Sequence, residues 1–152
     1  SEMCIRDRLN KAQIRDLLPH REPMLLIDEL INIKKLKSAT AVVNVTKESF
    51  FVKGHFPGEP VMPGVLQLET MAQAGGVLIL SKEKNPENFL TFFMKIDKVK
   101  FKHKVVPGDT IIFSCSLITP IRRGICHMQG FTYANGKLCA EAELMAQISK
   151  VK

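Results

Sequence analysis

The stretch that decides the fold is VLQLETMAQAGGVLIL, residues 65–80. It contains no proline, and Glu69 is its only charged residue. Apolar residues fall on every side of the helical wheel, which is typical of a buried helix. Such a helix would be roughly 24 Å long, and it is too short, and too polar at Gln67, Thr70 and Gln73, to cross a membrane. We therefore expect one long helix at the centre of the protein.

Shorter elements flank this helix. Asn10 is a favoured N-cap for a short helix over residues 11–18. Apolar runs predict six strands, over residues 24–33, 40–45, 90–101, 110–117, 126–133 and 138–148. Asn135-Gly136, between the last two strands, is the strongest hairpin signal in the chain. This order of elements predicts an α+β fold in which an antiparallel sheet wraps around the long central helix.

Composition limits the class of protein. The 152 residues suffice for one domain, and the net charge of +7 favours acidic partners such as nucleic acid, an anionic membrane or an acidic protein. A nucleic-acid module has no further support, because the chain has no tryptophan, one tyrosine and no zinc spacing. The lysines of residues 95–104 alternate with apolar residues, which indicates a solvated strand face or, alternatively, a patch for an acidic partner.

The four cysteines and the first residues bear on location and domain limits. No Cys-x-x-Cys pair is present, so we expect reduced thiols in an intracellular compartment. Residues 1–8 lack the apolar core of a signal peptide, and they share no pattern with the rest of the chain. We expect residues 1–8 to be a non-native leader, residues 9–152 to form a single domain, and the protein to be cytoplasmic.

Two side chains are candidates for chemistry. Glu69 lies in the buried helix, where desolvation would raise its pKa as a general acid requires; a structural ion pair is the alternative. His55 lies in a loop rich in proline and glycine, residues 53–64, directly before that helix. Free backbone N–H groups at the helix start would favour a polarised carbonyl oxygen there. A solvated or structural histidine is the alternative for His55.

Further motifs surround these two residues. They are Leu18-Pro19-His20-Arg21, Gly54-His55-Phe56-Pro57, Pro60-Val61-Met62-Pro63-Gly64-Val65, Leu68-Glu69 and Pro107-Gly108-Asp109. Over roughly residues 9–149 the chain resembles the 3-hydroxyacyl-acyl carrier protein dehydratases of bacterial fatty-acid synthesis. The resemblance implies a hot-dog fold and dehydration of (3R)-3-hydroxyacyl-acyl carrier protein to trans-2-enoyl-acyl carrier protein during chain elongation.

The resemblance also implies roles for individual residues. His55 would remove the C2 proton, and Glu69, protonated or acting through a water, would deliver a proton to the departing hydroxyl. The backbone at Gly64, with Val65 beside it, would bind the thioester carbonyl. Whether one residue makes both proton transfers stays open. No metal or organic cofactor is expected.

Substrate and partner contacts are expected at more distant positions. Candidates for an acyl tunnel are Met71, Phe92, Phe93 and Ile96, each of which would serve equally well in the core. Candidates for docking the acidic carrier protein are Lys98, Lys100, Lys102, Arg122 and Arg123. His20, His103 and His127 are interpreted as surface or structural histidines, and Arg21 as an anchor of the N-terminal segment.

Assembly is implied by the resemblance as well. It implies a homodimer, usually within a trimer of dimers, whose sites take the histidine from one subunit and the acid from the other. Binding to nucleic acid and insertion into a membrane are not expected.

One further stretch resembles versions of the family that are fused to a lipid A deacetylase, namely Pro120-Ile121-Arg122-Arg123-Gly124-Ile125-Cys126. The chain could therefore be one domain of a longer protein that also supplies lipid A synthesis. Rival hypotheses are another hot-dog activity, namely thioester hydrolysis or enoyl-CoA hydration, and an inactive scaffold.

Overall fold

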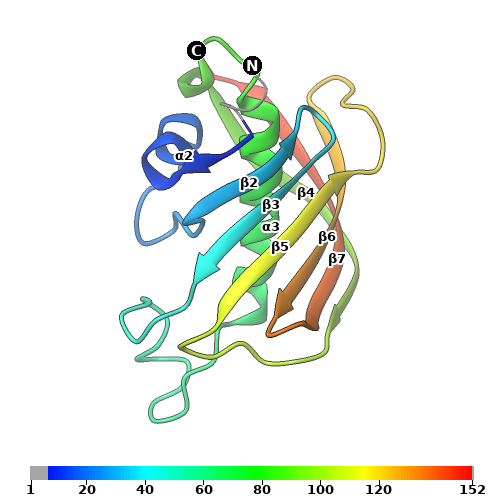
Figure 1. Ribbon diagram of the computed structural model, residues 1–152. Helices are drawn as coiled ribbons and strands as arrows, with labels where there is room; N and C mark the ends of the chain where they lie inside the picture. Colours follow the sequence, from blue (N-terminus) through cyan, green and yellow to red (C-terminus); the bar gives the residue numbers. More distant parts are fainter. Residues whose placement is uncertain (1–6, 152) are drawn as a thin grey trace.

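The chain forms one antiparallel sheet wrapped around a central helix (Figure 1), in a computed structural model that describes residues 7–151. The elements are β1 (Leu9–Asn10), α2 (Lys11–Leu17), β2 (Glu29–Lys34), β3 (Ser38–Asn44), α3 (Gly64–Leu80), the 3-10 turn η1 (Pro86–Asn88), β4 (Phe89–Phe101), β5 (Thr110–Leu117), β6 (Ile125–Ala134) and β7 (Lys137–Lys150). The strand order is β1-β2-β3-β5-β6-β7-β4, and every neighbouring pair is antiparallel. The predicted sheet-around-helix architecture is confirmed.

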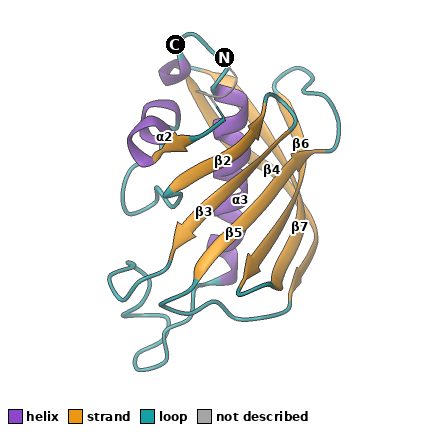
Figure 2. Cartoon of the chain, in the orientation of Figure 1, coloured by secondary structure: helices purple, strands orange, loops and turns teal. Residues whose placement is uncertain are grey.

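The helix α3 is buried along most of its length, as its apolar sequence predicts. Figure 2 shows the strands curving around it in a single layer, with the long loop that precedes α3 at one end of the sheet. Two reciprocal contacts bring α3 close to β6. A Cβ atom on Gly75 of α3 would overlap the thioether of Met128 on β6, and one on Gly130 of β6 would lie 2.6 Å from the Sδ of Met71 on α3. Each methionine therefore fills space that a glycine on the facing element leaves free.

The strand predicted over residues 24–33 begins later, at Glu29. Leu25, Leu26 and Ile27 of that run are buried, but Met24 and Leu26 bond to a side chain of α3 instead of joining the sheet. The Oε1 of Gln73 accepts the N–H of Leu26 at 3.0 Å, and its Nε2 donates to the carbonyl of Met24 at 2.7 Å. Gln73 thus ties the N-terminal segment to the central helix.

Local signals account for the remaining elements. Asn10 caps α2, because its side chain accepts the Gln13 N–H while the Gln13 side chain accepts the Asn10 N–H. Asn135 and Gly136 both have positive φ, 54° and 75°, as a two-residue hairpin turn with a right-handed twist requires. Both sequence-based predictions are confirmed. Among residues 7–151, no helix has the length and hydrophobicity that a membrane crossing requires.

The predicted leader, residues 1–8, lies mostly outside the described residues. Asp7 and Arg8 are described, and both lie against β2. The carbonyl of Asp7 accepts the N–H of Ile33 at 3.2 Å, and Arg8 pairs with Glu29 at 3.4 Å. The boundary between a leader and a single domain stays a prediction.

The strand β4 is an edge strand, paired with β7 alone. Register shifts at Phe93/Lys95 and at Asp97/Lys100 interrupt the alternation that the lysine run predicts. Residues 92–98 are exposed without interruption, so both faces of this stretch present side chains to solvent, apolar residues as well as lysines. The exposed apolar residues are Phe92, Phe93, Met94, Ile96 and Phe101. An edge strand of this composition is suited to being covered by another chain.

Candidate active site

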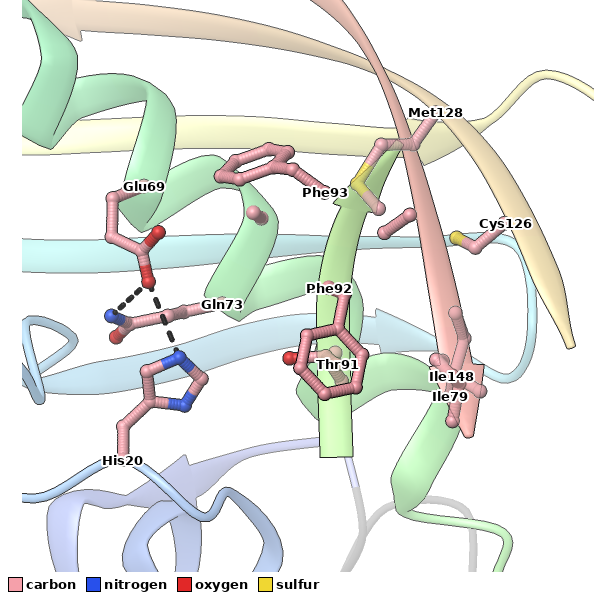
Figure 3. Close-up of a pocket in the computed structure, with 13 residues that line it drawn as sticks. His20, Glu69, Gln73, Ile79, Thr91, Phe92, Phe93, Cys126, Met128 and Ile148 are labelled. Carbon is pink, nitrogen blue, oxygen red and sulfur yellow. Dashed lines mark hydrogen bonds and ion pairs between the residues drawn. The ribbon is translucent and has the colours of Figure 1, made fainter. Parts of the chain in front are cut away.

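A cavity of about 50 Å³ lies between α3 and the β4, β7 and β6 side of the sheet (Figure 3). The carboxylate of Glu69 and the imidazole of His20 lie on one side, and Ile79, Cys126 and Ile148 lie on the other. The remaining lining residues are Ala72, Gln73, Gly76, Thr91, Phe92, Phe93, Met128 and Ala146. The arrangement joins one hydrogen-bonded acid to a mostly apolar space, which suits a ligand with a polar end and a hydrocarbon end.

The carboxylate of Glu69 is held by two neighbours through the same oxygen. Its Oε2 accepts the Nε2–H of Gln73 at 3.0 Å and lies 3.2 Å from the Nε2 of His20. The orientation of the Gln73 amide is fixed, because its Oε1 accepts the N–H of Leu26 and its Nε2 donates to the Met24 carbonyl. Gln73 can therefore only donate to Glu69, which requires Oε2 to be an acceptor.

The pKa of Glu69 departs from the sequence-based expectation. Burial raises this pKa, but hydrogen bonds from His20 and Gln73 and the charge of His20 lower it, and the net pKa lies below its ordinary value. The prediction of a raised pKa is therefore wrong, because it considered burial without these two donors. Glu69 is an ionised carboxylate at neutral pH.

His20 is the residue that sequence reasoning missed. Its side chain is 19% exposed and lines the cavity beside Glu69, so the interpretation as a surface or structural histidine did not anticipate its place. Arg21 holds the turn, because its Nη1 donates to the carbonyls of Leu18 and His20 at 2.9 and 2.6 Å. The motif Leu18-Pro19-His20-Arg21 was the available signal, but nothing in it indicates that the segment crosses α3 at Glu69.

His55 is fixed within its own loop. Its Nδ1 lies 2.8 Å from the carbonyl oxygen of Val61, and its ring stacks on Phe56 with centroids 4.0 Å apart. The peptide bond between these two residues is cis. Because a carbonyl oxygen only accepts, Nδ1 carries the proton in the neutral ring, and Nε2 keeps a lone pair that can take one.

One chain does not bring the two predicted catalytic side chains together. Within residues 7–151, the cavity that contains Glu69 is lined by no atom of His55, and the two side chains make no hydrogen bond or ion pair. The fold does bring Glu69 together with His20 and Gln73. The expectation that the histidine comes from another subunit stays a prediction.

Gly64 and Val65 form the first turn of α3, where backbone N–H groups have no acceptor within the helix. A Cβ atom on Gly64 would lie 2.7 Å from the Cε1 of Phe101, so glycine is needed for β4 to pass this closely. The side chain of Val65 is 68% exposed. The helix start is therefore open at Val65, while Gly64 is half-buried beside the Phe101 ring.

The predicted tunnel residues separate into two groups. Phe92 and Phe93 line the cavity, whereas Ile96 is exposed on β4 outside it. Met71 is fully buried against Gly130 and does not line the cavity. Its contacts favour the alternative interpretation of Met71 as a core residue.

The predicted docking residues are spread along β7 and its neighbours. Lys98 pairs with Glu143 at 2.9 Å and Lys100 with Glu141 at 3.9 Å, and the Lys102 N–H donates to the carbonyl of Cys139. The carbonyl of Arg123, which follows Arg122, accepts instead from Gln147, near the other end of β7. Gln147 lies eight strand residues, about 26 Å, from Cys139, but four residues, about 13 Å, from Glu143, the partner of Lys98. Lys102 and Arg123 are therefore too far apart to share one patch, and Lys98 lies between them.

The described cysteines are buried thiols without a nucleophilic environment. Burial raises the pKa of Cys126, which lines the cavity, to about 12, and burial with the charge of Cys126 does the same for Cys115. Thiolates are therefore scarce at neutral pH. Among residues 7–151, no group of three or more His, Cys, Asp and Glu side chains is placed to hold a metal ion.

Comparison with known proteins agrees with this fold. The FabA-like domain model matches residues 18–143. The dehydratase heterocomplex ApeI:P from Xenorhabdus doucetiae superposes with a TM-score of 0.78 at 21% identity, over 90% of this chain and 91% of that one. A hypothetical thioesterase with coenzyme A from Streptococcus pneumoniae superposes with a TM-score of 0.59 at 11% identity, over 80% and 84% of the two chains. The fold and the matched model define a hot-dog protein of the FabA-like class.

Curated relatives narrow this class. The chain is 44% identical to the 3-hydroxyacyl-[acyl-carrier-protein] dehydratase FabZ of Clostridium botulinum, over 93% of this chain and 97% of the relative. It is 52% identical to the bifunctional enzyme LpxC/FabZ of Bacteroides thetaiotaomicron, over 92% of this chain but 30% of that relative. The chain thus spans about a third of the length of such bifunctional relatives. It belongs to the FabZ family of 3-hydroxyacyl-acyl carrier protein dehydratases, the hydro-lyases of fatty-acid synthesis that the sequence motifs indicate.

Proposed function

We propose that this chain dehydrates (3R)-3-hydroxyacyl thioesters carried by acyl carrier protein, giving trans-2-enoyl thioesters. The observation that carries the proposal is the cavity, in which the hydrogen-bonded carboxylate of Glu69 lies beside an apolar space that extends to Cys126 and Ile148. Membership of the FabZ family supports the same reaction. The acyl chain would lie along Phe92 and Phe93.

His55 acts as the base. Its Nε2 takes the C2 proton, and the electron pair of the broken C–H bond moves toward the thioester carbonyl. The free N–H groups at Gly64 and Val65 stabilise the resulting negative oxygen, as donors aimed at a developing charge do. The hydrogen bond from Nδ1 to Val61 supports this role, because it leaves Nε2 as the proton acceptor.

Glu69 orients the hydroxyl that leaves. The lowered pKa of Glu69 makes it a poor proton donor at neutral pH, and its carboxylate can accept a hydrogen bond from the C3 hydroxyl instead. The proton that completes the departing water then comes from the imidazolium of His55. Cleavage of the C3–O bond and collapse of the enolate form the C2–C3 double bond, so one residue makes both proton transfers.

Two copies of the chain would share each site. The proposal is supported by the separation of His55 from the cavity of its own chain and by the exposed apolar residues of β4, an edge strand. A second copy packed on the apolar side chains of β4 would hide them from water, leave the lysine side chains at the rim of the contact, and bring its His55 to the Glu69 cavity. We propose a homodimer of this kind, and a trimer of dimers as the larger assembly.

The acidic carrier protein would dock at the lysines of β4 and the turn after it, Lys98, Lys100 and Lys102. All three lysines are exposed, but Lys98 and Lys100 already pair with glutamates, whereas Lys102 forms no ion pair within residues 7–151. Arg122 and Arg123, toward the other end of β7, would belong to a separate surface.

We further propose that the protein works in the cytoplasm and, within a longer chain like the bifunctional relatives, also supplies lipid A synthesis.

A steady-state assay tests the reaction directly. Carrier-protein thioesters of several chain lengths are offered as 3-hydroxyacyl and as plain acyl substrates, and enoyl formation is followed separately from free thiol release. We expect enoyl product from the hydroxyacyl substrates and no thiol release from either. Thiol release without enoyl product would replace the dehydratase proposal with thioester hydrolysis.

A further inference from the structure

We propose that His20 is a positioning residue for this reaction: with Gln73 it holds the Oε2 of Glu69 so that Oε1 meets the hydroxyl of the substrate. The inference rests on the proposed dehydratase function and adds a third side chain to it. His20 acts through Glu69 and does not itself touch the reacting atoms.

The geometry divides the two carboxylate oxygens of Glu69. The Nε2 of Gln73 and the Nε2 of His20 approach the same oxygen, Oε2, at 3.0 and 3.2 Å. Figure 3 shows the other oxygen pointing away from both donors, toward the cavity and Phe93. Oε1 has no hydrogen-bond partner among residues 7–151. The carboxylate is thus restrained about its terminal torsion, which is otherwise soft.

The surroundings of His20 indicate that its ring is kept for this contact. Its Nδ1 is buried and has no hydrogen-bond partner within residues 7–151, an arrangement that destabilises a fold and calls for another explanation. Arg21 fixes the backbone of His20 through the carbonyls on both sides of Pro19. Leu18 is held close to α3, because a Cβ atom on Gly76 would lie 3.2 Å from its Cδ2. The turn is therefore rigid and aims one ring nitrogen at Glu69.

Because it is the Nε2 of His20 that contacts Glu69, two substitutions can test whether the position of the donor matters. Nε2 of histidine corresponds in reach to the amide nitrogen of glutamine, whereas Nδ1 corresponds to that of asparagine. His20→Gln can therefore keep a donor at Oε2, and His20→Asn places its donor where the wild-type contact does not lie. His20→Ala removes the donor altogether.

The test compares these three variants with the wild-type protein in the dehydration assay on a 3-hydroxyacyl-carrier protein. We expect His20→Ala and His20→Asn to lower kcat by about 10-fold to 100-fold, while KM changes by less than about 3-fold. Losses of this size follow when a residue that orients a metal-binding side chain is removed, and His20 orients Glu69 in the same way. His20→Gln should keep kcat within about 5-fold of wild type. Thermal unfolding and oligomeric mass are measured for all variants.

His127 provides a matched control. It forms a second histidine–glutamate pair, with Nε2 3.4 Å from Glu143, and it does not line the cavity. His127→Ala should therefore leave kcat and KM unchanged. If His127→Ala lowered kcat as much as His20→Ala, the effect would be a general loss of a surface pair and the proposal would be overturned.

Other outcomes separate this inference from the proposed function. An active wild-type protein whose kcat survives His20→Ala would overturn the role of His20 while leaving the dehydratase intact. Equal losses in His20→Gln and His20→Asn at unchanged thermal stability would also overturn it, because the position of the donor would not matter. Absence of dehydration by the wild-type protein would instead overturn the proposed function.

Discussion

Glu69 and His55 lie close together in the sequence, yet their surroundings differ in kind. Glu69 is held by donors from α3 and from the N-terminal segment, facing a cavity lined by three strands. Within residues 7–151, the hydrogen bonds and ring contact of His55 are with Phe51, Phe56 and Val61, all in the segment that precedes α3. The acid therefore lies in a cavity of its own chain, while the base lies outside that cavity. The difference indicates two half-sites, which a second copy would join.

The largest effect should come from the base. His55→Ala should lower kcat by at least about 10³-fold, because in the proposed mechanism it removes the group that makes both proton transfers. Glu69→Gln should lower kcat less, by about 10²-fold, because the amide oxygen can still accept a hydrogen bond. Enoyl formation measured on both variants checks the order, and a larger loss in Glu69→Gln would return the acid role to Glu69.

Mixing the two variants tests the half-sites themselves. Each mixed dimer of His55→Ala and Glu69→Gln chains contains one intact site and one doubly altered site. Random exchange makes half of the dimers mixed, so about one quarter of wild-type activity should return. Dimers are dissociated, mixed and reassembled, with mass spectrometry to count mixed species. No recovery in demonstrably mixed dimers would place both residues in one chain.

The helix start should tolerate little change. Gly64→Ala would press a methyl group against the edge of Phe101, and since that ring is half exposed it can shift at a cost of about 1 kcal/mol in stability. We expect kcat to fall by about 10-fold, because the shifted turn misdirects its N–H groups. Adding Phe101→Leu should recover thermal stability, measured by calorimetry. A double variant no more stable than Gly64→Ala would contradict this account.

The smallest effect concerns pH. Because the folded-state pKa of Glu69 is lowered, the stability it contributes is present above its ordinary pKa of 4.5 and is lost as the pH falls through the folded value. The free energy of unfolding of wild type should exceed that of Glu69→Gln at neutral pH, and the gap should narrow on acidification. Denaturant unfolding of both proteins from neutral to acidic pH checks this. A constant gap would mean that the donors of Glu69 contribute no pH-dependent stability.

Local patterns were sufficient for the fold and insufficient for the cavity. The all-round apolar surface of α3, the capping residues of α2 and the Asn135-Gly136 turn each act within a few residues, so sequence alone locates them. The spacing of Glu69 and Gln73 also places them on one helix face. The partner of Gln73 cannot be found this way, because its amide bonds to backbone 47 to 49 residues away.

The same limit applies to the other misplaced residues. His20 reaches Glu69 only through the path that Arg21 and Gln73 impose on the segment between α2 and β2. Both faces of β4 are exposed over residues 92–98 and its pairing shifts register twice, and no pattern in its lysine run indicates either feature. Met71 was an equal candidate for tunnel or core, and only the glycine opposite it decides between them.

The packing of Met71 has a consequence for how the family can vary. Met71 occupies the space left by Gly130, and Met128 occupies the space left by Gly75, so volume is exchanged in both directions across one helix–sheet contact. A larger residue at Gly130 requires Met71 to move from its Cβ outward or to become smaller, whereas one at Gly75 meets only the flexible end of Met128. Positions 71 and 130 are therefore expected to change together among relatives. Because Met128 also lines the cavity, a change at position 75 or 128 would alter the shape of that cavity as well as the packing of the core.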